Sequence, residues 1–281
     1  MASIEQSNLW LERIVQAKQI ELADARSRVP QFILEKKVQP RPTGKFREAL
    51  EVRGEGQPEY AIIAELKRAS PSRGILCQHY NPVEIARGYQ QAGARALSVL
   101  TDKEFFLGSL EHLEQVKAAT SLPVLRKDFT LAEYHLYEAA AAGADAVLLI
   151  VAILQPAELD RLLRLSRELG LDVLVEVHTA EELRTALDAG SEIVGVNNRN
   201  LKTFAVSLET SVELIDRIPD KVIAVSESGL RTAEDLQRLR AAGFDAFLIG
   251  ERFMAEPDPG AALERLLAGL ATRTALHEYR R

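Results

Sequence analysis

Two stretches of the sequence decide the fold: Ala92-Gly93-Ala94-Arg95-Ala96-Leu97-Ser98-Val99-Leu100-Thr101 and Ala142-Gly143-Ala144-Asp145-Ala146-Val147-Leu148-Leu149-Ile150-Val151. In each, a glycine stands where the end of a helix needs a left-handed residue, and an apolar run follows within a few positions. A third near copy is Ala242-Gly243-Phe244-Asp245-Ala246, and looser versions occupy residues 169–173 and 189–193. The repeat predicts helix-to-strand junctions at intervals along the chain.

Eight strand-like runs fit this pattern, and stretches with helical spacing of apolar residues separate them. The runs are residues 61–67, 96–101, 123–127, 146–151, 172–177, 193–197, 222–226 and 246–249. Most are continuously apolar, which is typical of parallel strands buried on both faces. A closed barrel and an open doubly wound sheet both fit such alternation. Eight regular units, with no G-x-G-x-x-G after the first run, favour an α/β fold with a single (β/α)8 TIM barrel.

The first 57 residues lie outside the alternating pattern. Leu11, Ile14, Val15 and Leu22 recur on one face of an expected helix, and a short helix is expected near residues 46–50. We predict an N-terminal helical extension over residues 1–57, packed on the barrel as a lid or plug. After a polar linker at residues 53–58, a catalytic barrel over residues 58–281 completes one structural domain.

Composition excludes several classes of function. The chain has 281 residues and a net charge of −6, which argues against a general affinity for nucleic acid. Its longest apolar run, residues 146–154, is too short to cross a membrane, and its N-terminus has no secretory signal. Cys77 is the only cysteine, so no internal disulfide can form. We expect a cytoplasmic protein that binds neither nucleic acid nor membrane.

Charged residues recur at the ends of four of the predicted strands. Alternate side chains of a barrel strand point inward, and those at the C-terminal ends line the active site. This parity brings together Glu65, Lys67, Lys127, Glu176, Asn197 and Arg199. Such charges are costly to bury unless they are paired or used, so a purely structural ion pair is the alternative. Lysines beside carboxylates suit general acid catalysis if burial moves their pKa toward neutrality.

The last two βα units carry Ser228-Gly229-Leu230 and Ile249-Gly250-Glu251. Loops after the seventh and eighth strands of such barrels commonly bind phosphate through backbone N–H groups. A phosphate site is therefore favoured there over a simple turn. Helix starts are predicted by Thr179 with Glu182 and by Thr232 with Asp235. His178 stands beside the first of these, which favours a structural role for it.

At this point the chain resembles the indole-3-glycerol-phosphate synthase family. The most specific motif is Glu65-Leu66-Lys67-Arg68-Ala69-Ser70-Pro71-Ser72 together with Lys127-Asp128-Phe129. The resemblance continues, in order, through residues 98–102, 174–177, 195–201, 226–229 and 248–250. It implies a carboxy-lyase of tryptophan biosynthesis. Its substrate would be 1-(2-carboxyphenylamino)-1-deoxyribulose 5-phosphate, and it would need no metal or organic cofactor.

The resemblance also implies a role for each site residue. Lys127 would be the general acid, assisted by Lys67 and Glu65, and Glu176 would be the base or acid–base partner; which lysine protonates which intermediate stays open. The substrate would be held by Asn197, Arg199, Glu227, Ser228, Phe106, Phe129, Leu148 and Leu201, and its phosphate by Ser70, Lys67, Gly229, Gly250 and the backbone of Glu251. Because a carboxylate repels phosphate, we expect the Glu251 side chain to turn away.

Two rival readings remain. A phosphate-binding isomerase barrel, such as phosphoribosylanthranilate isomerase, would share the phosphate end but not the set of charged residues. A catalytically silent barrel that serves only as a binding partner fits poorly, because competent residues fill the ionisable positions. We expect residues 70–81 to close over the substrate. We also expect a monomer, with association with other tryptophan-pathway enzymes left open.

Overall fold

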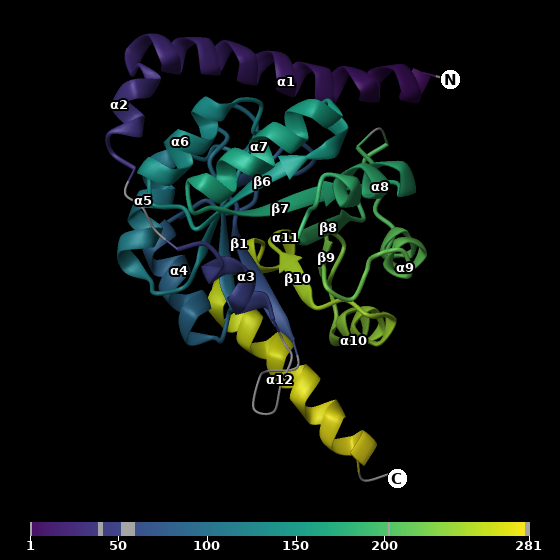
Figure 1. The fold of residues 1–281 in the computed structure, drawn as a ribbon. Coiled ribbons are helices and arrows are strands. Elements are labelled where there is room, and N and C mark those ends of the chain that lie inside the picture. The colour runs from purple at the N-terminus through teal and green to yellow at the C-terminus, as the bar shows by residue number, and fades with distance from the viewer. Residues whose placement is uncertain (1, 39–41, 52–59, 202, 279–281) are drawn as a thin grey trace.

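The computed structural model describes residues 2–38, 42–51, 60–201 and 203–278, and its eight principal strands close into a parallel barrel (Figure 1). In chain order these strands are β1 (Ala61–Leu66), β4 (Ala96–Leu100), β5 (Val124–Lys127), β6 (Ala146–Ile150), β7 (Asp172–Val177), β8 (Ile193–Asn197), β9 (Ile223–Glu227) and β10 (Ala246–Ile249). Every strand pairs with its neighbours in the chain, and β1 pairs with β10 to close the ring. The predicted barrel is confirmed, with each strand end within one residue of its expected place. The predicted linker lies outside the described residues.

Helices surround the barrel, and the larger ones follow the strands in alternation. They are α4 (Pro82–Gln91), α5 (Leu110–Ala119), α6 (Glu133–Ala141), α7 (Pro156–Glu168), α8 (Ala180–Asp188), α9 (Glu209–Ile215), α10 (Ala233–Ala242) and α12 (Pro259–Glu278). Shorter elements are the hairpin β2 (Ala69–Ser70) and β3 (Gly74–Ile75), the 3-10 turn η1 (Val151–Ile153) and α11 (Glu251–Met254). The N-terminal segment forms α1 (Ala2–Arg28), α2 (Gln31–Glu35) and α3 (Lys45–Leu50).

The strand side chains divide into two apolar clusters. One fills the barrel interior and includes Ile63, Leu125, Leu174 and Val225. The other, larger cluster lies between the strands and the surrounding helices. This division is what a barrel requires, because successive side chains of a strand point to opposite faces.

The short helix α3 plugs the barrel at the N-terminal ends of the strands. Its Phe46 and Leu50 are fully buried within the interior cluster. The carboxylate of Asp172, at the start of β7, accepts hydrogen bonds from the backbone N–H groups of Gly44, Phe46 and Arg47. Those N–H groups have no partner inside the helix, so Asp172 both caps α3 and holds it in place.

The long helix α1 crosses the opposite end of the barrel, where the strands finish (Figure 1). The predicted apolar face is confirmed at Ile14, which is buried, while Leu11, Val15 and Leu22 are half-buried. A lysine shares this face: Lys18 is only 2% exposed, and its Nζ lies 2.8 Å from Asp128 and 3.1 Å from Asp102. The N-terminal extension therefore supplies both a plug, α3, and a lid, α1.

We predict that Lys18→Met lowers the free energy of unfolding by about 3 kcal/mol or more. The substitution would remove the cation paired with buried Asp102 and leave Asp128 with Arg126 alone, which costs far more than losing a surface pair. Urea unfolding followed by circular dichroism measures the change. Arg238→Met is the control, because Arg238 and its partner Glu209 are about half exposed and their pair contributes roughly 1 kcal/mol or less. Equal losses in the two variants would contradict the anchoring role of Lys18.

Candidate active site

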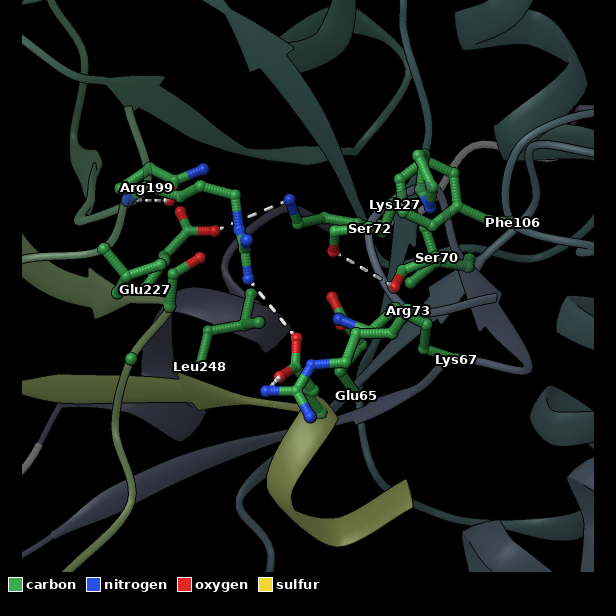
Figure 2. A pocket seen from close by; sticks show the side chains of 18 of the residues that line it. Glu65, Lys67, Ser70, Ser72, Arg73, Phe106, Lys127, Arg199, Glu227 and Leu248 are labelled. Atoms are coloured by element: carbon green, nitrogen blue, oxygen red, sulfur yellow. Dashed lines mark hydrogen bonds and ion pairs between the residues drawn. The ribbon is translucent and has the colours of Figure 1, made fainter. Parts of the chain in front are cut away.

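A cavity of about 550 Å³ opens where the barrel strands end, beneath α1. Its lining includes every residue that the sequence predicted for the site: Glu65, Lys67, Ser70, Phe106, Lys127, Phe129, Leu148, Glu176, Asn197, Arg199, Leu201, Glu227, Ser228, Gly229, Gly250 and Glu251. The side chains come from opposite walls and converge on one space (Figure 2). The charged residues at the strand ends, which the alternation of side chains predicted to face the same space, do line one cavity.

Lys127 is the centre of the charged group. Its Nζ lies 3.0 Å from Oε2 of Glu176 and 3.5 Å from Oε2 of Glu227, and both carboxylates are almost fully buried. Burial alone lowers the pKa of Lys127, but the charges of Glu176, Glu227 and Glu65 outweigh it and raise that pKa above its ordinary value. The expected move of the Lys127 pKa toward neutrality is thus wrong. Lys127 is instead a firmly protonated ammonium.

The two carboxylates beside Lys127 differ in charge state. Burial raises the pKa of Glu176, but the attraction of Lys127 and His178 outweighs burial and holds that pKa well below its usual range. Burial and the neighbouring charges of Glu176 and Glu65 raise the pKa of Glu227 to about 8. Oε1 of Glu227 is buried without a hydrogen-bond partner. Glu176 is thus a carboxylate ion, whereas Glu227 is able to hold a proton at neutral pH.

A second ion pair joins the two charged residues of β1. Nζ of Lys67 lies 2.7 Å from Oε1 of Glu65, and Lys67 is the more exposed of the two. Gly250 makes room for this pair, because a Cβ at that position would lie only 2.3 Å from the same Glu65 oxygen. The glycine after β10 is therefore explained by close packing against a charged side chain, in addition to any part in anion binding.

The loop after β9 begins with two consecutive residues in the left-handed region. Ser228 and Gly229 are both left-handed, with φ of 66° and 79°. Nδ2 of Asn198 donates to the carbonyl oxygen of Ser228 at 3.1 Å and so supports a conformation that serine rarely adopts. Strain held by a neighbouring side chain at the rim of a cavity is a common mark of a functional loop.

The side chain of Glu251, expected to turn away from a bound phosphate, pairs with two arginines at the mouth of the cavity. Its carboxylate lies between two arginines, 3.1 Å from Arg73 of the β2–β3 hairpin and 3.3 Å from Arg199 after β8. Arg73 and Arg199 reach across the mouth of the pocket in Figure 2. The mutual attraction of these groups offsets the repulsion that a lone carboxylate would exert on an anion. It also links the β2–β3 hairpin to the far side of the cavity.

The remaining wall is apolar. The rings of Phe106 and Phe129 lie with their centroids 6.3 Å apart, and Leu148 and Leu201 line the same cavity. Sequence reasoning placed Leu11 and Ile14 on the buried face of α1, but it did not assign them or Trp10 to the cavity, which all three line. Helix α1 thus forms part of the site. The spacing of its apolar residues predicted a buried face but not what that face would contact.

His178, expected to have a structural role beside a helix cap, contacts both the cap of α8 and a residue of the cavity. Its Nε2 lies 3.3 Å from Oε1 of Glu176, on the side away from Lys127, and its Nδ1 lies 3.0 Å from Glu182. The two carboxylates raise the pKa of His178 to about 9, although burial opposes them. The alternation of side chains along β7 could have indicated this contact, because His178 shares its parity with Glu176.

Within the described part of the chain, no group of three His, Cys, Asp or Glu side chains is arranged to hold a metal ion. The helices described there include none with the length and apolar character needed to cross a membrane.

A closed (β/α)8 barrel with lysine–carboxylate pairs, an apolar slot and a glycine-flanked rim defines an enzyme that performs acid–base chemistry on a small anionic, partly aromatic molecule. The model of one family, described as indole-3-glycerol phosphate synthase, matches residues 11–266. The chain belongs to the indole-3-glycerol phosphate synthase family.

Curated relatives support this assignment over most of the chain. The chain is 48% identical to the indole-3-glycerol phosphate synthase of Albidiferax ferrireducens, over 92% of this chain and 98% of the relative. It is 43% identical to that of Carboxydothermus hydrogenoformans, over 92% of this chain and the whole relative. A third, from Chlorobium phaeovibrioides, is 56% identical over 73% of this chain and 79% of its own length.

Solved structures show the fold in more distant proteins. One is 3-hexulose-6-phosphate synthase from Salmonella typhimurium, with a TM-score of 0.61 and 12% identity over 75% of this chain and 99% of that one. Another is thiamine phosphate pyrophosphorylase from Pyrococcus furiosus, with a TM-score of 0.59 and 16% identity over 76% of this chain and 96% of that one. These likenesses concern the barrel alone.

We predict that Gly195→Ala lowers kcat about a hundredfold while the barrel stays folded. A Cβ at Gly195 would lie 2.0 Å from Oε1 of Glu227, so the Glu227 carboxylate must shift from its place beside Lys127, and displacements of about 1 Å can cost that much. Steady-state kinetics with circular dichroism measure both effects. In the control, Gly269→Ala on α12, the nearest atom to the added methyl would be 3.7 Å away. Wild-type kcat in Gly195→Ala would show that the position of Glu227 does not matter.

Proposed function

We propose that this cavity carries out the reaction implied by its family. In that reaction 1-(2-carboxyphenylamino)-1-deoxyribulose 5-phosphate undergoes ring closure, loses CO₂ and water, and becomes indole-3-glycerol phosphate. The observation that carries the proposal is the ammonium of Lys127, fixed between two buried carboxylates and beside an apolar slot. Acid, base and ring site thus meet in one cavity, as a cyclising lyase requires.

Ring closure needs a proton donor. The aromatic carbon that bears the carboxylate attacks the ketone carbon, a C–C bond forms, and the ketone oxygen gains a negative charge. Lys127 donates its proton to that oxygen. Its raised pKa does not prevent this, because an alkoxide is itself a strong base and the ammonium is fully protonated beforehand. The electron pair of the bond to the carboxyl carbon then restores the aromatic ring as CO₂ leaves.

Dehydration needs both an acid and a base. The hydroxyl formed at ring closure must leave with a proton, and the adjacent methylene carbon must lose one. Glu176, held as a carboxylate ion, accepts the carbon-bound proton, while Lys67 or Lys127 supplies the proton to the departing hydroxyl. Glu65 orients Lys67 through their 2.7 Å contact. Glu227, with its pKa near 8, hydrogen-bonds a substrate hydroxyl with the oxygen that lacks a partner.

Substrate binding follows the two halves of the cavity. Phe106, Phe129, Leu148 and Leu201 take the anthranilate ring, with Trp10 of α1 closing over it. The phosphate lies at the glycine rim, near Ser70, Lys67, Gly229, Gly250 and the backbone of Glu251. Asn197, Arg199 and Ser228 hold the hydroxyls and the carboxylate. The segment of residues 70–81, which includes most of the β2–β3 hairpin, closes over the bound molecule and carries Arg73 with it.

The domain organisation and the surroundings of the enzyme are also part of this proposal. We place residues 1–57 and 58–281 in one structural domain, since α1 and α3 both pack on the barrel. We expect a monomer in the cytoplasm, with association with other tryptophan-pathway enzymes left open. Size-exclusion chromatography at assay concentrations measures the oligomeric state.

The substrate that the protein turns over distinguishes the synthase from two rival functions. An isomerase would turn over phosphoribosylanthranilate, and a silent barrel would turn over neither compound. The buried lysine–carboxylate pairs favour the synthase, because a barrel that only binds a partner gains nothing from burying them.

We predict that Lys127→Ala abolishes indole formation to within about a thousandth of the wild-type rate, because it removes the proton donor. Fluorescence of the indole product reports turnover of the carboxyphenylamino-deoxyribulose phosphate. Lys117→Ala is the matched control, since Lys117 is also paired with a carboxylate, Asp145, at 2.6 Å but lies outside the cavity lining. If the wild-type protein is folded but forms no product, the synthase assignment is wrong. If Lys127→Ala remains active, Lys127 is not the general acid.

We predict that Glu251→Gln strengthens competitive inhibition by inorganic phosphate by about threefold to tenfold. Without the carboxylate, Arg73 and Arg199 lose their internal counter-charge and become available to the anion, a gain of about 1 kcal/mol at a half-exposed site. Inhibition constants at fixed ionic strength measure the effect, with Glu256→Gln as a control on the general change of charge. Weaker inhibition in Glu251→Gln would place the phosphate elsewhere.

A further inference from the structure

We propose that His178, as an imidazolium between two carboxylates, is a positioning residue that holds one oxygen of Glu176 and leaves the other for Lys127. This inference rests on the proposed function, because it assigns His178 to the working of Glu176. The structure presents an unbroken series of charges that runs from the surface to the cavity: Glu182, His178, Glu176 and Lys127.

The geometry of this series is set by the end of β7 and the start of α8. Glu182 accepts a hydrogen bond from the backbone N–H of His178 at 2.7 Å, and the same oxygen lies 3.0 Å from Nδ1. These contacts direct Nε2 toward Oε1 of Glu176, 3.3 Å away, as a contact of opposite charges rather than an aligned hydrogen bond. Oε2 of Glu176 is then free to accept from Lys127 at 3.0 Å. Each oxygen of Glu176 thus has its own cation.

The buried rim holds one carboxylate more than it holds lysines. Glu65, Glu176 and Glu227 are set there against Lys67 and Lys127. Unbalanced buried carboxylates take up protons, and the raised pKa of Glu227 makes it the one that does so. Glu176 has Lys127 on one side and the imidazolium of His178 on the other, so Glu176 and not Glu227 stays ionised.

The groups that act on His178 are few. Glu176 from β7 and Glu182 from α8 both raise its pKa, to about 9, against the effect of burial. His178 in turn acts through space on Glu227 of β9. The 3-10 turn η1, which also contacts α8 and β7, contributes no charged side chain. At neutral pH the ring is therefore charged, and it loses its proton only at alkaline pH.

His178 does not line the cavity, so its effect on the reaction must pass through Glu176. This separates it from the residues that touch the substrate. The loss of such a group should lower kcat and leave KM nearly unchanged, since binding contacts are intact.

A helix cap alone does not account for the arrangement. At the start of α7 the carboxylate of Glu158, at the same third helical position as Glu182 in α8, accepts from the backbone N–H of the N-cap residue Gln155 at 2.9 Å, without any histidine. Capping thus requires only the carboxylate. At the start of α8 there is a further contact, between Nε2 of His178 and Glu176, which capping does not require.

The test compares His178→Gln with wild type, using the indole fluorescence assay across pH. We expect kcat to fall roughly tenfold to a hundredfold, the range for groups that orient a reactive ligand, with KM within about twofold. Because the lost cation lets the pKa of Glu176 rise, the acid limb of the kcat profile should move to higher pH by about one unit or more. Wild-type kcat and an unshifted limb would overturn the proposal.

A second pair of variants distinguishes the proposed role of His178 from a general loss of stability. Glu182→Gln keeps an oxygen for the backbone N–H but loses the charge, so it should lower the His178 pKa, read by NMR, and shift the acid limb in the same direction. Glu158→Gln, with the matched loss at α7, should change the melting temperature similarly but leave the profile alone. Identical effects of the two variants would show that His178 serves only the cap.

Glu176→Gln separates this inference from the proposed function. An active Glu176→Gln variant would show that Glu176 is not the base, and the proposed mechanism would then be wrong. An inactive Glu176→Gln variant together with a fully active His178→Gln variant would reject only the positioning role of His178.

Discussion

The contact of Lys127 with two buried carboxylates is the interaction on which the rest of this structure depends. An ammonium ion in the interior of a protein is tolerated only if opposite charges lie within a few ångströms. Here three strands meet that need at once, because β5 carries the lysine while β7 and β9 carry Glu176 and Glu227. Closure of the barrel is what brings these strand ends onto one rim, since residues of like parity in neighbouring strands face the same interior.

Space for these charges comes from glycines rather than from loose packing. Gly195 lies against Glu227, and Gly250 lies against Glu65, each so closely that a methyl group would collide. The interior below is filled by aliphatic side chains and sealed by Phe46 of α3. The charged layer is therefore confined to one level of the barrel, with a dry core beneath it and a cavity above it, an arrangement that strengthens electrostatic interactions with a bound molecule.

Much of this could be predicted from the sequence, and the reasons are physical. The strands were recognisable because both faces of a parallel strand are buried, which leaves continuous apolar runs such as that of β6. The strand-end charges followed from parity and the glycine rim from the position of the last two βα loops, while the family resemblance added the apolar slot. What could not be predicted are contacts between side chains far apart in the chain. Lys18 with Asp128, and Arg73 with Glu251, depend on how a helix and a hairpin lie across the mouth, and no local period encodes that. The direction of the Lys127 pKa shift was missed for a related reason: burial and attraction oppose each other, and only the distances decide which is larger.

The position of Lys18 has a consequence for how the protein is made. The helix that bears it is translated before Asp102 and Asp128, so its counter-charges do not yet exist when it leaves the ribosome. Until β4 and β5 have been synthesised and paired, α1 has nowhere to dock, and its apolar face and lysine both remain in water. Helix α1 therefore reaches its place only after β4 and β5 have formed, although it is synthesised before them, and the cavity cannot be roofed earlier.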